Sequence, residues 1–436
     1  MLLVFVLLVG LALAEEGWLS RHLGSKSPYP TPEAEPLWVT CPLVQVHLVA
    51  RHGTRYPSEG DTASFDDLYT IFAKLSKQPK YGWLHNWTNI YKEAVPTSLS
   101  SQGELDMYQL AQRMSAKYNA VLKSISFEAD SISMLSSETT RASRSASAFA
   151  LGLLEGRGEL GPSRLKTLAL NTLPRRMDTF MAVKYACDYW LEVVQNNDFR
   201  DKQMELYGER HLNETLMRFW HDLGLRLEPT DLTQIYRLCA YEIAFRNQSN
   251  TWCTFLTRHD IATLEYLDDL EDYYTYSYGN PFNLIMGCEL WQNLITSMQE
   301  TVTLDAPLAA TFKFGHAETI QFLATLLHIF QDDEPLLADT PPQVIRHRKY
   351  KGSQLTPFGA NVIFEVYQCA KTAKDTHVRL LVNERTIRIP GCEADVCTLE
   401  QLKAIRKDAL GCKLKDICTM KKVESRQVAI QWKHDL

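Results

Sequence analysis

Two arginines and a histidine lie together in one short polar segment of this chain. They are Arg51, His52 and Arg55, in the stretch Arg-His-Gly-Thr-Arg-Tyr-Pro that follows an apolar run. Positive charges held this close repel one another, so the segment costs stability unless something anionic neutralises it. Guanidinium groups match the geometry of phosphate oxygens and bind them in pairs of hydrogen bonds. The segment therefore predicts a local anion site, and phosphate is an anion that fits it.

Two later segments supply side chains of matching chemistry. Arg141 follows a strand-like run and a polar turn, and His316 with Glu318 follows a second strand-like run. Three guanidinium groups, those of Arg51, Arg55 and Arg141, could hold the three non-bridging oxygens of a phosphoryl group. Phosphoryl transfer asks a protein mainly for such positioning and charge stabilisation. We therefore expect the three arginines to form a phosphate clamp.

The histidines and the glutamate have roles in the same chemistry. The neutral ring nitrogen of His52 can attack phosphorus and form a phosphohistidine, which water then hydrolyses. The leaving alkoxide needs a proton, which the carboxylic acid of Glu318 could give. His316 would contact the transferring phosphoryl group as a further donor. This reaction calls for no metal ion and no other cofactor.

Simpler interpretations exist for each residue taken alone. An isolated Arg-His-Gly occurs by chance, Arg51 and Arg55 could be paired with aspartates, and a single Arg141 is usually a solvated helix residue. His47, inside the apolar run, is more typical of a core histidine than of a ligand. The joint occurrence of the segments is what favours the catalytic interpretation.

Strand-like and helix-like segments alternate around these residues. The strands are expected at 43–50, 132–137, 310–314, 360–367 and 378–382, and the helices at 102–118, 141–154 and 319–330. Open α/β sheets build their sites where strands end and helices begin, and helix N-termini there offer N–H groups to an anion. We therefore expect an α/β fold with a central, mixed and mostly parallel sheet flanked by helices.

The residue composition and periodicity of the chain change in its middle third. Residues 170–300 hold long helix-like stretches, many aromatic side chains, acidic runs and few strand signals. This pattern indicates an all-helical cap inserted into the α/β core. The predicted division is a core of residues 37–165 and 301–436, with the cap at 170–300.

The N-terminus is typical of a cleaved signal peptide. Residues 1–14 are uniformly apolar, end in Ala-Leu-Ala and precede Glu15 and Glu16, but they lack a basic start. They are too short to span a bilayer, and a buried N-terminal strand is the alternative. No other stretch is apolar and long enough for a membrane helix, so no stable membrane insertion is expected. The chain is expected in the secretory pathway, either secreted or in the endoplasmic reticulum lumen.

Cysteines and acceptor tripeptides agree with that compartment. The chain has ten cysteines, most of which should pair where conditions are oxidising. Cys392 with Cys397 and Cys412 with Cys418 are close enough to bridge locally, although the sequence leaves the connectivity open. A zinc site is the alternative, disfavoured because neither spacing is Cys-x-x-Cys. Glycosylation acceptors occur at three asparagines, Asn86, Asn213 and Asn247.

The C-terminus and the net charge bear on location and partners. The last four residues, Lys-His-Asp-Leu, resemble a degenerate retrieval signal of the endoplasmic reticulum, or the match is incidental. The net charge of −6 excludes a global basic surface for nucleic acid. Any anion site must therefore be local, and no nucleic-acid partner is expected.

Taken together, the motifs resemble a known family. Arg-His-Gly-Thr-Arg-Tyr-Pro after a strand, Ser-x-x-x-Arg-x-x-x-Ser-Ala-x-Ala-Phe around Arg141, and Gly-His-Ala-Glu-Thr are similar to the histidine acid phosphatase branch of the phosphohistidine superfamily. His316-Ala317-Glu318, in place of the His-Asp of general acid phosphatases, resembles the multiple inositol polyphosphate phosphatases. Further similar segments lie at 102–113, 252–257, 278–280, 357–361 and 383–385, so the resemblance covers nearly the whole mature chain.

The resemblance implies the roles that the residue types suggested. It implies His52 as nucleophile and Glu318 as proton donor, with His316 as a second phosphate contact and the three arginines as the clamp. One position departs from the family pattern. Aligned on the aspartate and cysteine of its helical-domain segment, Ala182 stands where the family has an arginine thought to meet substrate phosphates, with Lys184 two residues later. On a helix these positions face different sides, so Lys184 is not a simple replacement, although it is a candidate substrate contact.

The predicted function is hydrolysis of phosphate monoesters in inositol polyphosphates, such as inositol hexakisphosphate, through a phosphohistidine. The resemblance also implies 2,3-bisphosphoglycerate as a substrate. A broad acid phosphatase is the first alternative, favoured if the cap lacks anion contacts. A secreted protein that binds polyanions without turnover is the second, and its signature would be loss of His52 or Glu318, both of which are present.

Overall fold

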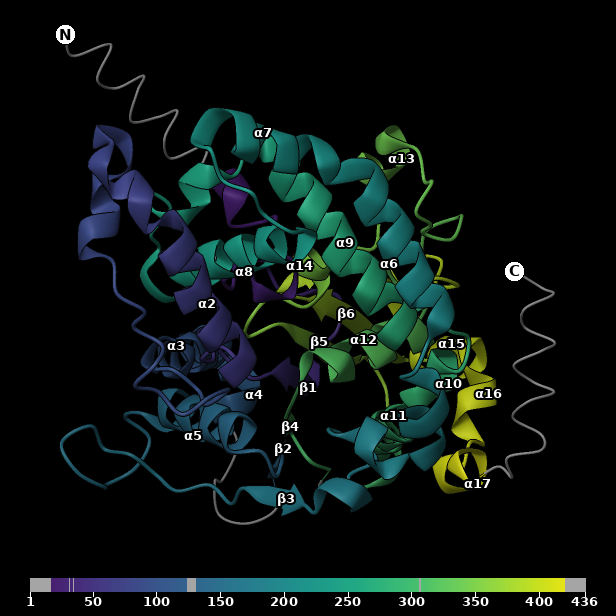
Figure 1. Cartoon of the computed structure of the whole chain (residues 1–436). Coiled ribbons are helices and arrows are strands. Elements are labelled where there is room, and N and C mark those ends of the chain that lie inside the picture. The colour runs from purple at the N-terminus through teal and green to yellow at the C-terminus, as the bar shows by residue number, and fades with distance from the viewer. Residues whose placement is uncertain (1–16, 31, 34, 124–130, 306, 420–436) are drawn as a thin grey trace, which may run out of the picture.

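A single mixed sheet runs through the molecule. The computed structural model describes residues 17–30, 32–33, 35–123, 131–305 and 307–419 (Figure 1). The strand order is β3-β2-β4-β1-β5-β6-β7, and β8 pairs with β6. The strands are β1 (Leu43–Arg51), β2 (Ile132–Ser137), β3 (Asn171–Leu173), β4 (Ala310–Gly315), β5 (Asn361–Gln368), β6 (Thr376–Val382), β7 (Arg385–Thr386) and β8 (Val396–Thr398). The predicted mixed sheet is confirmed.

The two halves of the sheet differ in direction. β1, β2 and β3 all run parallel to their neighbours in the first half, with Arg51 of β1 opposite Gly315 of β4 and Ser136 of β2 opposite Phe314. The second half, from β1 to β5 and on to β6, is antiparallel. Because the parallel strands end together, β1, β2 and β4 bring their C-terminal residues to one edge of the sheet.

Helices cover both faces of this sheet. Their bounds are α2 (Glu59–Phe72), α3 (Ser101–Lys117), α4 (Asn119–Lys123), α5 (Thr140–Leu154), α6 (Asp198–His211), α7 (Asn213–Leu223), α8 (Pro229–Arg246), α9 (Arg258–Tyr276), α10 (Asn283–Met286), α11 (Cys288–Thr303), α12 (Ala317–Leu326), α13 (Pro342–His347), α14 (Gly352–Leu355), α15 (Leu399–Ile405), α16 (Lys407–Leu410) and α17 (Leu414–Cys418). Figure 1 shows α3 and α5 on one side of the strands and α11 and α15 on the other.

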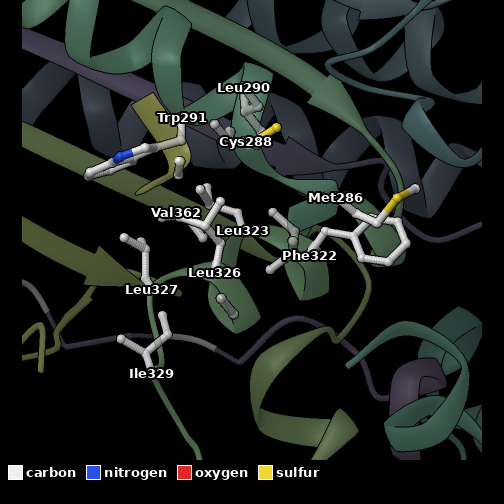
Figure 2. Packing of buried hydrophobic residues seen from close by; sticks show 14 of the residues in the cluster. Met286, Cys288, Leu290, Trp291, Phe322, Leu323, Leu326, Leu327, Ile329 and Val362 are labelled. Carbon is white, nitrogen blue, oxygen red and sulfur yellow. The ribbon is translucent and has the colours of Figure 1, made fainter. Parts of the chain in front are cut away.

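Alternation along the strands explains the two layers. Leu48 of β1 belongs to the apolar cluster with α3 and α5, whereas its neighbour Val49 belongs to the cluster with α11 and α12. This follows from the two-residue period of a strand. Figure 2 shows the second cluster, where Trp291 of α11 and Leu323 of α12 pack over Val362 of β5.

A third apolar cluster lies among helices away from the sheet. It joins α2 to α7 and α8, and aromatic rings such as Phe72, Phe219 and Trp252 contact one another edge to face inside it. The segment 170–300 is mostly helical, but its first residues form β3 at the edge of the sheet, and α2, from before this segment, packs on α8. The division at 37–165, 301–436 and 170–300 stays a prediction.

All ten cysteines form disulfides. The pairs are Cys41–Cys369, Cys187–Cys418, Cys239–Cys253, Cys288–Cys412 and Cys392–Cys397. The local bridge at 392 and 397 forms, whereas 412 and 418 pair with partners far away in sequence. Gln292 of α11 explains part of this, because its amide donates to the carbonyl oxygens of Ala409 (2.8 Å) and Cys412 (2.7 Å) and holds that turn against α11.

Several sequence expectations concern the ends of elements or the surface. The helix expected at 319–330 is α12, which begins earlier and ends at Leu326, because His328 and Phe330 have positive φ angles of 54° and 61° that end helical geometry.

The three predicted glycosylation sites, Asn86, Asn213 and Asn247, are all exposed. Residues 1–14 and the last four residues lie outside the described residues. Within the described part, no helix combines the length and apolarity that crossing a membrane requires.

Candidate active site

The ends of β1 and β4 hold His52 rigidly at the sheet edge. The His52 N–H donates to the carbonyl of Gly315 at 3.1 Å, and the His52 carbonyl accepts from the N–H of Gly359 at 3.0 Å. Its ring Nδ1 lies 2.8 Å from the carbonyl oxygen of Gly53. A carbonyl can only accept, so Nδ1 carries the proton and Nε2 keeps its lone pair. The ring is 3% exposed, so this lone pair lies in a nearly dry site.

The charge state of His52 follows from its surroundings. Burial, followed by the nearby charges of Arg51 and Arg141, lowers the pKa of His52 well below its ordinary value. The ring is therefore neutral over the mildly acidic range, which is the form that can act as a nucleophile.

Gly53 and Thr54 fix the turn after His52. A Cβ on Gly53 would lie 2.2 Å from the carbonyl oxygen of Gly103 in α3, so only glycine allows this close approach. The Thr54 carbonyl accepts from the N–H (3.0 Å) and hydroxyl (2.8 Å) of Ser100, which caps α3. Asp106 of α3 accepts from the Thr54 N–H at 3.1 Å. The loop is thus attached to the N-terminal part of a helix.

Arg51 is held from behind by backbone carbonyls. Its Nη1 donates to the carbonyl oxygens of Ser25 and Thr356, and its guanidinium carbon lies 4.6 Å from the ring centre of Phe358. Its Nε is buried and has no hydrogen-bond partner among the described residues. Burial, and then the charge of Arg55, lowers the pKa of Arg51 to about 9. No carboxylate of the described residues forms an ion pair with Arg51, and the acidic side chains that raise its pKa, Glu318 and Asp272, act on it only at longer range.

Arg55 and Arg141 are also free of carboxylate partners. Arg55 Nη1 donates to the carbonyl of Tyr56 at 2.7 Å and to the hydroxyl of Tyr241 at 3.2 Å. Arg141 Nη2 lies 3.3 Å from His316 Nδ1, while its buried Nε has no partner among the described residues. No ion pair in the described part of the chain joins these arginines or Arg51 to an acid, so pairing with aspartates does not explain them.

His316 lies between β4 and α12. Arg141 can only donate, so His316 Nδ1 accepts, and Nε2–H donates to the hydroxyl of Ser137 at 3.0 Å. The Ser137 hydroxyl in turn contacts the hydroxyl of Thr139 at 2.9 Å. Burial lowers the pKa of His316 to about 3 despite the opposing charge of Glu318. The ring faces that of His52, with centroids 5.8 Å apart.

Glu318 lies in the first turn of α12 and meets Lys184. Glu318 Oε1 is 2.8 Å from Lys184 Nζ, and both side chains are 14% exposed. Burial alone would raise the pKa of Glu318, but Lys184 and His316 outweigh it and hold the pKa well below its ordinary value. The short 3₁₀ helix Val183–Ala186 carries Lys184, while Ala182 is 2% exposed and faces the core.

The structure thus places every predicted catalytic and phosphate-binding residue at one sheet edge, with Lys184 beside Glu318. It also adds side chains that sequence reasoning missed. Ser137 orients His316, Tyr241 contacts Arg55, and Ser25 holds Arg51 through its carbonyl. Ser137 ends the same strand that leads to Arg141, which was an available signal. A contact made by a backbone carbonyl cannot be predicted from the type of side chain at that position.

The described residues offer little to a metal ion. Their one grouping with ligand spacing is Cys41, Cys369 and His377. The two cysteines form a disulfide with each other, so no thiolate is available there. His47 is fully buried and bonded to Thr311 and Gln45, both at 2.7 Å, as a core histidine.

Comparison with known proteins decides the family. Residues 42–383 match the model of the histidine phosphatase superfamily, branch 2. The chain belongs to this superfamily. It is a phosphatase, and it is 30% identical over 445 residues to multiple inositol polyphosphate phosphatase 1 of Gallus gallus, covering 94% of this chain and 95% of that one. The protein of the same name from Homo sapiens is 26% identical, over 92% and 86% of the two chains.

Solved structures share the fold of this phosphatase. The phytase from D. castellii superposes with a TM-score of 0.77 at 21% identity, over 92% of this chain and 88% of that one. The multiple inositol polyphosphate phosphatase of Bifidobacterium longum, in complex with inositol hexasulfate, gives 0.68 at 17% identity, over 89% and 98%. The α/β fold with its helical part is therefore that of the histidine phosphatases.

Proposed function

We propose that this phosphatase hydrolyses phosphate monoesters of inositol polyphosphates through a covalent intermediate on His52. The observation that carries the proposal is the arrangement around His52 Nε2. A neutral nitrogen with a free lone pair lies among three guanidinium groups that have no carboxylate partner, two of which have a buried, unpartnered Nε–H. Such a group of donors suits a phosphoryl dianion and the charge that develops during its transfer.

In the first half-reaction the P–N bond forms as the P–O bond to the inositol breaks. Arg51, Arg55 and Arg141 hold the non-bridging oxygens, and the Gly53 carbonyl stabilises the Nδ1–H of His52 as its ring gains positive charge. Glu318, when protonated, gives its proton to the leaving alkoxide. In the second half-reaction the Glu318 carboxylate takes a proton from water, whose oxygen attacks phosphorus and releases His52.

His316 has a distinct place in this scheme. It accepts from Arg141 and donates to Ser137, so in the free protein it orients the clamp. Contact with the phosphoryl group requires its ring to exchange one of these partners. The role of His316 as a second phosphate contact is part of the proposal.

The substrate class rests on charge and on the similar proteins. The similar curated proteins include phytases and multiple inositol polyphosphate phosphatases, and one structure of the same fold binds inositol hexasulfate. Two further cations lie near the clamp, Lys184 paired with Glu318 and half-exposed Arg175 paired with Glu138, and a substrate phosphate could compete for them. A substrate with several phosphates can use these charges, whereas a simple monoester cannot.

The test measures phosphate release from inositol hexakisphosphate by the wild type and by His52→Ala, with EDTA present. Release by the wild type alone supports the proposal. If neither the wild type nor His52→Ala releases phosphate from inositol hexakisphosphate, but the wild type releases it from an aryl phosphate, the proposed substrate class is wrong. Equal release by both variants would overturn the role of His52.

A broad acid phosphatase is the second candidate, because Ala182 brings no cation to the site. The ratio of kcat/KM on inositol hexakisphosphate to that on a small aryl phosphate separates the two candidates. Assay of 2,3-bisphosphoglycerate beside them tests the third implied substrate.

We also propose a secretory-pathway location, with glycans on Asn86, Asn213 and Asn247. Five disulfides support an oxidising compartment, and the three asparagines are exposed. Treatment with a peptide N-glycosidase should lower the mass of protein secreted by eukaryotic cells. An unchanged mass would overturn the glycosylation proposal.

A further inference from the structure

The residue that pairs with the proton donor lies on a different element from every catalytic motif. We propose that Lys184 keeps Glu318 ionised until a second phosphate group of the substrate draws the Lys184 ammonium away, so that a polyphosphate activates its own proton donor. This inference rests on the proposed function and deepens it. It makes Lys184 a residue that determines specificity between polyphosphates and simple monoesters.

The pair is built into the fold rather than formed by two mobile side chains. The segment before Lys184 is fixed by Asp178, whose carboxylate accepts from the N–H groups of Phe180 (3.1 Å) and Met181 (2.7 Å). The carbonyl of Met181 accepts from the hydroxyl of Thr319 at 2.7 Å. Thr319 follows Glu318 directly in α12, so the segment that carries Lys184 is attached beside the carboxylate that it meets. The disulfide of Cys187 to Cys418 fixes the other end.

In this state Glu318 has no proton to give. The groups that face it are Lys184 from its 3₁₀ helix, His316 before α12, Arg51 from β1, Arg141 from α5 and Tyr276 from α9. The three cations favour the carboxylate, and only burial opposes them. The resulting pKa lies well below that of an ordinary glutamate, so the carboxylate is ionised at mildly acidic and neutral pH.

The surroundings of Lys184 show what can remove it. Glu318 is its one carboxylate partner among the described residues, and its ammonium also lies 5.2 Å from the ring centres of Tyr185 and Tyr276. The ring of Tyr185 also lies 4.9 Å from the guanidinium carbon of Arg175, whose side chain is 45% exposed and pairs with Glu138 at 3.6 Å. Arg175 and Lys184 therefore both lie against this ring, the first more exposed and the second next to Glu318. A phosphate carries close to two negative charges and three acceptor oxygens, so it competes well with one carboxylate.

The exchange of partners by Lys184 changes the number of bound protons only at Glu318. When the second phosphate takes over the ammonium, Lys184 keeps all of its protons. Glu318 is left buried beside Tyr276 without its nearest cation, so its pKa rises and it takes one proton from solvent. It gives this proton to the leaving alkoxide as His52 bonds to phosphorus, and regains a proton from the attacking water in the second half-reaction.

The experiment compares wild type, Lys184→Met and Lys184→Arg on two substrates with poor leaving groups. These are inositol hexakisphosphate and glycerol 2-phosphate, and an activated aryl phosphate serves as the control. In the wild type, the rate constant of the first half-reaction at saturating substrate should fall at a higher pH for the hexakisphosphate than for glycerol 2-phosphate, because this quantity reports the pKa of Glu318 in the enzyme–substrate complex. Lys184→Met should raise kcat/KM on glycerol 2-phosphate about tenfold for each unit by which the pKa of Glu318 rises, while lowering it on the hexakisphosphate. Lys184→Arg should resemble the wild type.

A binding measurement removes the dependence on turnover. Inositol hexasulfate bound to the wild type at mildly acidic pH should bring uptake of about one proton per site, seen by calorimetry in buffers of different ionisation enthalpy. Lys184→Met should bind with no uptake, because its Glu318 is already protonated. Thermal unfolding of each variant checks that it is folded.

The outcomes separate this inference from the proposed function. The proposed role of Lys184 is wrong, and the proposed function stands, if the wild type hydrolyses the hexakisphosphate but its rate falls at the same basic pH for both substrates. The same conclusion follows if Lys184→Met lowers kcat/KM equally on both substrates. If the wild type hydrolyses only the aryl phosphate, the proposed function is wrong.

Discussion

Two buried groups of charged side chains lie in this phosphatase, and they are arranged in opposite ways. At the sheet edge, Arg51, Arg55 and Arg141 gather without any carboxylate partner among the described residues. In the second group, Arg348 pairs with Asp269 of α9 at 2.9 Å and with Glu265 at 3.4 Å. The arginines of the first group form no direct ion pair, whereas Arg348 of the second group forms two.

The second group is also fully hydrogen-bonded. His22 Nδ1 lies 2.9 Å from Oε2 of Glu265, the same oxygen that Arg348 approaches, and the N–H of Gly352 donates to Asp269 at 2.8 Å. It therefore joins the N-terminal segment, α9 and the loop before α14 into one unit. A buried cation that is paired serves structure, and several that are unpaired and converge on a nucleophile serve a ligand. Matched substitutions test this difference.

The largest effect is expected for Arg141→Met. Removing one guanidinium from the clamp should lower kcat/KM about 10³-fold or more, as loss of a phosphate-stabilising arginine does elsewhere. Stability should stay within about 1 kcal/mol, because burial already lowers the pKa of Arg141 and its contact with neutral His316 is weak. Steady-state kinetics and urea unfolding measure the two effects. A large loss of stability would show that Arg141 is structural.

Arg348→Met is the matched change in the second group. It leaves Asp269 and Glu265 buried without their cation, which should cost about 3–5 kcal/mol of unfolding free energy. Once folded, the variant should keep the kcat of the wild type, since Arg348 touches no residue of the clamp. The measurement is urea unfolding together with kcat per folded molecule. Arg348→Lys, which retains a charge, serves as the control.

Glu318→Gln should produce an effect that depends on the leaving group. For inositol or glycerol esters, loss of the proton donor should slow turnover about 10²-fold or more. For an activated aryl phosphate the leaving group hardly needs a proton, so kcat/KM, which reports formation of the phosphohistidine, should fall by no more than about threefold. The slopes of log kcat/KM against leaving-group pKa compare the variants. Parallel slopes for wild type and Glu318→Gln would remove the proton-donor role.

The lowered pKa values of His52 and His316 predict how kcat depends on pH in the acidic range. The neutral fraction of an ordinary imidazole falls about 50-fold between pH 6.5 and pH 4.5. Burial lowers the pKa of His316 to about 3, and burial with Arg51 lowers that of His52 well below its ordinary value. Both rings stay neutral above these lowered values, so kcat on an aryl phosphate should be nearly constant from pH 6 to 4.5. A fall with a midpoint near 6.5 would contradict this.

The same shifts carry a stability consequence. In the unfolded chain these histidines bind protons below about pH 6.5, whereas in the folded protein they do so only at the lowered pKa. Unfolding is therefore favoured progressively as the pH falls from 6.5 toward 3. Neutral-pH stability is fully present above 6.5, and urea midpoints measured over this range should decrease with falling pH.

Much of the sheet edge could be predicted from the sequence. Apolar runs of the right length gave β1, β2 and β4, and the charged residues after them lie together because parallel strands end at a common edge. Side chains whose chemistry is local to a motif, such as His52 and Glu318, are recognised by type and spacing. The placement of Arg51, Arg55 and Arg141 beside them was predictable for the same reason.

Other features depend on contacts that no spacing encodes. The pairing of Lys184 with Glu318 arises because a segment distant in sequence is attached to α12 through Thr319. The balanced cluster of Arg348 joins parts of the chain hundreds of residues apart, and the disulfides of Cys412 and Cys418 cross between elements. The extra strand β3 has only the residues Asn171–Leu173, too few for a periodic pattern to indicate it.

Lys313 is a buried cation that belongs to neither of the two groups. This lysine of β4 is 5% exposed, and its Nζ donates to the hydroxyl of Thr311 at 3.0 Å. Burial lowers its pKa to about 8, and no carboxylate pairs with it in the described part of the chain. It is thus an unbalanced buried cation that lies below the site rather than in it.

The smallest effect is therefore expected for Lys313→Met. The folded pKa lies below the unfolded one, so the charged lysine destabilises the fold at every pH below about 8, and the cost disappears as the pH rises toward 10.5. Its replacement by an apolar side chain of similar length should raise the unfolding free energy at pH 6 by about 1–3 kcal/mol, without changing kcat. A gain in stability at unchanged kcat would show that one unpaired cation does not mark a site, and that convergence of several on a nucleophile does. A fall in kcat would instead place Lys313 among the charges that set the field around His52.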